Sequence, residues 1–134
     1  MDSKIKSPKK IARNSYPLPK DAKWHKLTIK FFDGHTVKIG YEGMATKTFD
    51  YKDMGFGNDK TNNPDTKWDF LKVIAENGGS LTALKYERRF SRNVKYEVNK
   101  LLKTFFGMKD DPIPRYNRTD GYKPLFNIES DERR

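Results

Sequence analysis

The stretch 91–108 has the apolar spacing of a single amphipathic helix. Its apolar positions recur at i, i+4, i+7, i+8 and i+11, which places them on one helical face. They are Val94, Val98, Leu101, Leu102 and Phe105. Ser91 or Asn93 can cap the first turn, and Gly107 supplies the left-handed residue that ends many helices. The pattern therefore predicts a helix over 92–106 whose opposite face is polar.

The polar face of this predicted helix carries cations and hydrogen-bonding groups at the same period, with no carboxylate among them. Its members are Arg92, Tyr96, Asn99 and Lys103, with Lys100 beside them. Guanidinium, ammonium, phenol and carboxamide groups suit phosphates and base edges. The same face would also serve as the solvated outside of a core helix, so the spacing alone leaves both interpretations open.

Residues 24–51 alternate between apolar and polar positions, which is the period of half-buried strands. The apolar positions of the first two strands are Trp24, Leu27, Ile29, Phe31, Val37, Ile39 and Tyr41. Asp33-Gly34 and Glu42-Gly43 are turn signals between the strands. The segment therefore predicts a small antiparallel β-meander, with its third strand within 44–51.

Two further helices are expected after the meander. Asn63-Pro64-Asp65 follows a polar loop and has the composition of a helix start, because proline is favoured in the first turn and Asn or Asp can cap. We expect a helix over 65–77 that stops at Gly78-Gly79. Its core positions are Trp68, Leu71, Ile74 and Ala75. A shorter helix is expected over 80–90.

The last apolar segments, 113–119 and 122–128, are joined at Asp120-Gly121 and predict a β-hairpin. Pro114 and Pro124 lack the N–H that a central strand needs, so they favour strand ends or an edge strand. A fold with an antiparallel meander, three helices and a final hairpin belongs to the α+β class.

The net charge of the 134 residues is +10, and it is divided unevenly along the chain. Residues 1–23 have net charge +5, residues 24–84 are neutral, residues 85–126 have +6 and the last eight residues have −1. Clustered cations favour a polyanion as partner, because counterion release rewards them together. Residues 1–22 have no apolar period and read as a disordered basic arm. We expect one domain over 23–129 and a disordered tail over 130–134.

Composition excludes several classes of site. The chain has no cysteine, so it has no disulfide, thiolate zinc site or cysteine nucleophile. His25 and His35 have no metal-ligand partners at suitable spacing, and we expect no metal and no cofactor. No apolar run approaches a membrane span, and no secretory signal is recognisable, so we expect a cytoplasmic protein. Asp110-Asp111 is an adjacent pair and no nucleophile triad is recognisable, so we do not expect an enzyme.

Three stretches resemble the OmpR-type winged helix-turn-helix effector domain of bacterial response regulators, here without a receiver domain. WDFLKVIAENGGSLT resembles the first helix of that family and its exit into a Ser/Thr-capped second helix. VKYEVNKLLKTFFG resembles the recognition helix. DPIPRYNRTDGYKPLF resembles the wing hairpin. The wing residues that match are Arg115, Tyr116, Thr119, Gly121 and Tyr122.

The resemblance implies a DNA-binding transcriptional regulator whose helix 92–106 enters the major groove, with the 113–128 hairpin near the backbone. Carried over by position, the groove-facing and wing residues would be Arg92, Lys95, Tyr96, Asn99, Lys103, Arg118 and Lys123. Within this scheme Lys95, Lys100 and Lys123 would contact phosphates. Asn99 would suit adenine and Arg92 guanine.

Other partners remain open at the level of the sequence. Tyr96, Tyr116 and Tyr122 with their basic neighbours would equally suit an interaction module that binds an acidic protein, since aromatic and arginine side chains are common interface anchors. RNA is a weaker alternative, because most aromatic residues occupy core-period positions and leave no stacking platform. The sequence determines neither a DNA target nor an oligomeric state.

Overall fold

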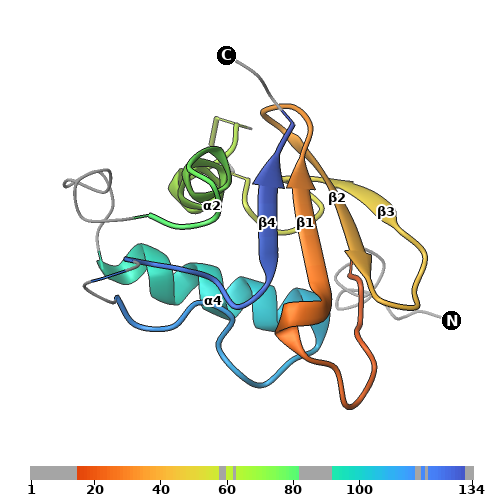
Figure 1. Ribbon diagram of the computed structural model, residues 1–134. Helices are drawn as coiled ribbons and strands as arrows, with labels where there is room; N and C mark the ends of the chain where they lie inside the picture. Colours follow the sequence, from red (N-terminus) through yellow and green to blue (C-terminus); the bar gives the residue numbers. More distant parts are fainter. Residues whose placement is uncertain are drawn as a thin grey trace, which may run out of the picture.

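The computed structural model describes residues 15–57, 60–61, 63–81, 92–116, 119 and 121–131. The elements in this part of the chain are η2 Trp24–Lys26, β1 Leu27–Phe31, β2 Thr36–Tyr41, β3 Lys47–Asp50, α2 Thr66–Glu76, α4 Arg92–Phe106 and β4 Asn127–Ser130. Four strands form a sheet, and α2 and α4 pack beside it (Figure 1).

The sheet is mixed, with strand order β3-β2-β1-β4. β1 pairs antiparallel with β2, and β2 pairs antiparallel with β3, so the meander expected from the alternation is confirmed. β4 pairs parallel with β1, with Ile29 opposite Ile128. The amide of Asn127 reinforces this pairing, because its Nδ2 donates to the carbonyl oxygens of His25 and Leu27 at 3.2 and 3.3 Å.

The core lies between one face of the sheet and the two helices. Alternate residues of each strand are buried there, as the period of two requires. The Phe31 ring of β1 lies 5.0 Å from the Trp68 ring of α2, and the Phe49 ring of β3 lies 5.0 Å from the Phe105 ring of α4. Both helices therefore cover the same face of the sheet, and its polar positions face solvent on the other side.

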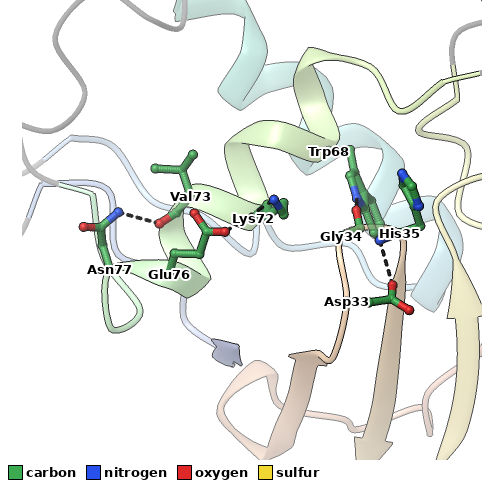
Figure 2. Close-up of polar contacts among 8 residues, drawn as sticks. All are labelled: Asp33, Gly34, His35, Trp68, Lys72, Val73, Glu76 and Asn77. Carbon is green, nitrogen blue, oxygen red and sulfur yellow. Dashed lines mark hydrogen bonds and ion pairs between the residues drawn. The ribbon is translucent and has the colours of Figure 1, made fainter. Parts of the chain in front are cut away.

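α2 confirms the helix expected over 65–77. Asp65 caps it, since its Oδ1 accepts from the backbone N–H of Trp68 at 3.2 Å, and Gly78 and Gly79 follow its end with φ of 78° and 100°. The exit is closed by Asn77, whose Nδ2 donates to the carbonyl of Val73 at 2.7 Å (Figure 2).

One hydrogen bond ties α2 to the first hairpin turn. The indole Nε1 of Trp68 donates to the carbonyl of Gly34 at 2.9 Å, so the helix reaches the turn between β1 and β2 (Figure 2). In the same turn Asp33 Oδ1 accepts from the backbone N–H of His35 at 2.8 Å. A local signal, Asp33-Gly34, and a distant side chain, Trp68, therefore fix one turn together.

The predicted winged-helix arrangement is wrong. The described residues contain two α-helices, α2 and α4, and one four-stranded mixed sheet. They form no C-terminal hairpin wing. The second arm of the expected hairpin becomes β4 and joins β1, while Tyr122 makes an isolated bridge with Leu81. Prolines at 112, 114 and 124 remove backbone donors that a hairpin ladder would use. The helix expected over 80–90 lies outside the described residues.

The expected boundaries of the disordered ends also need correction. Within the arm predicted over 1–22, residues 15–22 pack on the domain, and Tyr16 is buried. The backbone N–H groups of Tyr16 and Leu18 donate to the carbonyls of Phe105 and Phe106 at 3.1 and 3.0 Å. The phenol of Tyr16 donates to the Ala45 carbonyl at 2.7 Å.

Residues 1–14 lie outside the described residues. At the other end, Ser130 belongs to β4 rather than to a tail, and the N–H of Asp131 donates to the carbonyl of Phe31 at 2.7 Å. The described part of the domain thus extends beyond the predicted 23–129 on both sides.

Replacing Trp68 with Phe should destabilise the fold by about 1–3 kcal/mol, because it removes the bond to Gly34 and part of a buried ring. The measurement is the urea midpoint at constant m-value. The control is Phe32→Leu at an exposed position, expected within about 0.5 kcal/mol of the parent. A Trp68→Phe midpoint equal to that of the control would contradict the role given to this contact.

Asp33 should make stability depend on pH on the acid side. The hydrogen bond from the His35 N–H is the largest effect that lowers the pKa of the Asp33 carboxyl below its ordinary 3.8. A depressed folded pKa adds stability above the unfolded pKa, and that stability is lost as the pH falls through the folded pKa. The difference in unfolding free energy between parent and Asp33→Asn should therefore shrink between about pH 6 and pH 3. A difference that stays constant over this range would contradict the assignment.

Candidate nucleic-acid interface

α4 turns a row of polar side chains to solvent. Among the residues of α4 whose side chains the structure describes, the exposed ones are Asn93, Tyr96, Glu97, Lys100 and Thr104. Tyr96 is the most exposed large aromatic side chain among the described residues, at 64%. Tyr96 and Lys100 are one turn apart and therefore neighbours on the surface. We refer to Asn93, Tyr96, Glu97, Lys100 and Thr104 as the α4 row.

Two lysines supply positive charge at the α4 row: Lys100, which belongs to it, and the half-buried Lys95 beside it. Lys95 Nζ lies 4.9 Å from the centroid of the Tyr96 ring, where the ring quadrupole attracts an ammonium. Neither Lys95 nor Lys100 forms an ion pair with a described residue, whereas Lys72 pairs with Glu76 at 3.4 Å. Because no described carboxylate is paired with either ammonium, both ammoniums remain available to an anion.

The exposed face of α4 carries a carboxylate that the polar face predicted from the sequence lacks. The expected polar face held no carboxylate, yet Glu97 is exposed and lies in the α4 row. An exposed carboxylate among lysines lowers the local positive potential. A glutamate can also accept from the amino group of cytosine in the major groove.

Asn99, expected to contact a base, lies in the core and is 2% exposed. Its Nδ2 donates to the carbonyl of Ile113 at 3.0 Å, and its Oδ1 accepts from the N–H of Ile113 at 2.9 Å. Both ends of the carboxamide are thereby used to hold the segment after α4 against the helix. The prediction that Asn99 reads adenine is therefore wrong, because its polar atoms are satisfied inside the protein.

Lys103 is partly neutralised. Its Nζ lies 2.8 Å from Oδ1 of Asp111, with both side chains accessible to solvent. An exposed pair of this kind is weak, so it lowers the tendency of Lys103 to bind a phosphate without preventing it.

The remaining predicted DNA contacts are scattered. Lys123 is exposed but lines a hollow with Gly78 and Gly79 at the end of α2, and that hollow shares no residue with the α4 row. Arg92 begins α4, and its side chain lies outside the described atoms; Arg118 lies outside the described residues. Among the described contacts, the structure brings Lys95, Tyr96 and Lys100 together and leaves Lys123 apart.

Sequence reasoning missed two lysines that border α4. Lys52 and Lys67 come from the loop after β3 and from the start of α2, and together with Lys100 they line one hollow. The loop was expected to be merely polar. The sequence feature that could have indicated its packing is the pair of apolar residues Met54 and Phe56. Both are buried and attach the loop to the core.

Two classes of site are not seen in the described part of the chain. Those residues hold no group of three or more His, Asp or Glu side chains placed to bind a metal ion. They also include no helix with the length and apolar character to cross a membrane.

Comparison of the chain with protein-family models, with curated proteins and with solved structures gave no match. The assignment of a function therefore rests on the geometry and charge described above.

Replacing Asn99 with Ala should cost at least about 2 kcal/mol of unfolding free energy, because the buried N–H and carbonyl of Ile113 would both lose their partner. The matched control is Asn93→Ala on the exposed face of the same helix, expected within about 0.5 kcal/mol of the parent. Urea unfolding of both variants measures the difference. Equal stability of the two variants would contradict the structural role of Asn99.

Proposed function

We propose that this protein binds double-stranded DNA through the α4 row and the neighbouring Lys95. The observation that carries the proposal is the group of Lys95, Tyr96 and Lys100, in which two ammoniums that form no ion pair with a described residue flank an exposed phenol. The chain around them has a net charge of +10. Clustered cations bind a polyanion because each phosphate contact releases condensed counterions.

The shape of α4 supports the proposal. The helix has 15 residues, and the major groove of B-DNA is wide enough to admit an α-helix. Lys95 and Lys100 would contact phosphates, which set register without reading sequence. The groups on the row that could contact bases are the Asn93 carboxamide, the hydroxyls of Tyr96 and Thr104, and the Glu97 carboxylate.

The burial of Asn99 changes the expected balance between affinity and specificity. Because the Asn99 carboxamide is bonded to Ile113, the only carboxamide on the α4 row is that of Asn93, at the start of the helix. Good bidentate contacts are what give about 1–3 kcal/mol of discrimination per base. The proposed binding is therefore mainly electrostatic, with a modest preference among sequences.

A second candidate function is docking of an acidic protein. Aromatic anchors favour it, because Tyr96 and Tyr116 are both exposed, the latter at 39%. The two functions differ in their dependence on salt. Binding to duplex DNA falls steeply and linearly in a plot of log affinity against log salt, with about 0.9 per phosphate neutralised.

The test is a salt titration of binding to a random-sequence duplex, followed by fluorescence anisotropy. The double change of Lys95 and Lys100 to Ala should lower the slope by about 1.8, since each lysine accounts for about 0.9. The control is Lys38→Ala, which removes an exposed cation from the opposite face of the sheet and should leave the slope unchanged. No binding by the parent at low salt, or equal losses in both variants, would sink the proposal and favour the protein-docking alternative.

A further inference from the structure

A hollow of about 540 Å³ lies between α4 and the loop that follows β3. This volume falls in the range of small-molecule sites, which run from about 300 to 1,000 Å³. Met54 and Phe105 are buried at its base, and the partly buried Leu101 lies beside them. Lys52 and Lys100 also line it. The hollow therefore combines an apolar surface with cations.

The loop wall of the hollow is held in place by its own hydrogen bonds. The backbone N–H of Asp50 donates to Oδ2 of Asp53 at 3.0 Å, and the N–H of Asp53 donates to Oδ1 of Asp50 at 2.9 Å. The N–H of Phe56 donates to the carbonyl of Tyr51 at 2.9 Å. Such a wall needs little ordering when a ligand arrives, which favours binding.

Gly55 sets how closely the loop approaches the helix. Its φ is 87°, a conformation that L side chains rarely adopt, and a Cβ at this position would lie 3.3 Å from Cδ2 of Leu101. The glycine thus lets the loop backbone pack against Leu101, and both residues line the hollow.

The charges around the hollow favour an anion. Lys67 is paired with Asp65 at 2.8 Å, and the Asp53 carboxylate is used on the Asp50 N–H. Lys52 and Lys100 form no ion pair with a described residue, and two carboxylates, Asp53 and Glu97, also line the hollow. Three lysines against two carboxylates give the lining itself a net charge of +1, and Lys52 and Lys100 supply the ammoniums that an anion can reach.

We propose that this hollow binds a small organic anion, with its apolar body on Met54, Leu101 and Phe105 and its phosphate or carboxylate between Lys52 and Lys100. Charge-assisted hydrogen bonds from the two ammoniums hold the anionic group, and the apolar contact adds burial. Lys100 also belongs to the α4 row, so an occupied hollow removes one cation from the DNA-binding face. This last consequence rests on the proposed DNA binding, whereas ligand binding itself does not.

The test uses phenyl phosphate as probe, followed by ¹H–¹⁵N chemical-shift mapping on the full chain without DNA. Shifts should concentrate at the amides of Gly55, Leu101 and Phe105, with a dissociation constant at or below about 1 mM. Inorganic phosphate keeps only the anionic group, and benzyl alcohol keeps only the apolar ring. Each should bind at least about tenfold more weakly than phenyl phosphate. Equal binding of inorganic phosphate, or shifts scattered over the surface, would overturn the proposal.

Two variants sharpen the test. Changing Lys52 and Lys100 to Gln should weaken phenyl phosphate about tenfold and leave benzyl alcohol unaffected, because the apolar surface is retained. Leu101→Glu should abolish binding of both probes, while Leu125→Glu, at a 50% exposed leucine outside the hollow, should not. Parent-like binding by the Lys52/Lys100 variant would overturn the anion assignment.

The consequence for DNA is tested separately. At constant ionic strength, phenyl phosphate should weaken duplex binding more than an equal concentration of inorganic phosphate does. Absence of duplex binding by the parent would refute the proposed DNA binding but not the proposed ligand binding in the hollow, since the mapping experiment contains no DNA. Absence of localised chemical shifts would refute ligand binding in the hollow and leave the test of DNA binding unaffected.

Discussion

The last turn of α4 is the point on which the rest of the structure depends, because three parts of the chain meet there. Phe105 and Phe106 point their rings at Phe49, Trp24 and Tyr16, with centroid distances of 5.0, 5.9 and 6.2 Å. Their carbonyls, which a helix end leaves without partners, accept N–H groups from residues 16 and 18. Aromatic packing and helix capping thus join the N-terminal segment, the sheet and α4 in one cluster.

This cluster also fixes the rotation of α4, and with it the candidate interface. The apolar period alone places five residues in the core. Phe106 and Asn99 widen the buried arc, because Phe106 packs on Trp24 and Asn99 holds the backbone of Ile113. The outward residues are consequently Tyr96 and Lys100 with their neighbours, rather than a row that contains Asn99. The chemistry offered to a partner changes from base-reading carboxamide to ammonium and phenol.

Placing the loop after β3 against α4 has a second effect on the interface. Lys52 and Lys67 lie 48 and 33 residues before Lys100 in the sequence, yet they share a hollow with it. The cations near α4 are therefore an assembly of three elements. Apolar residues of the loop, Met54 and Phe56, produce this arrangement because their burial draws the loop onto the core.

The sequence by itself determined the elements whose causes are local: α2 with its Asp65 cap and glycine exit, the extent of α4, and the β1–β2–β3 meander with its Asp33-Gly34 turn. Each follows from periodicity and capping within a few residues. Only the tertiary structure decided the partner of β4. Asn127 and Leu27, whose carbonyl accepts from Asn127 Nδ2, are 100 residues apart in the sequence. Parallel strands are not joined by a tight turn, so no local turn signal predicts that they pair. The same holds for Tyr16 and Asn99, whose burial depends on backbone groups that only the folded chain brings to them.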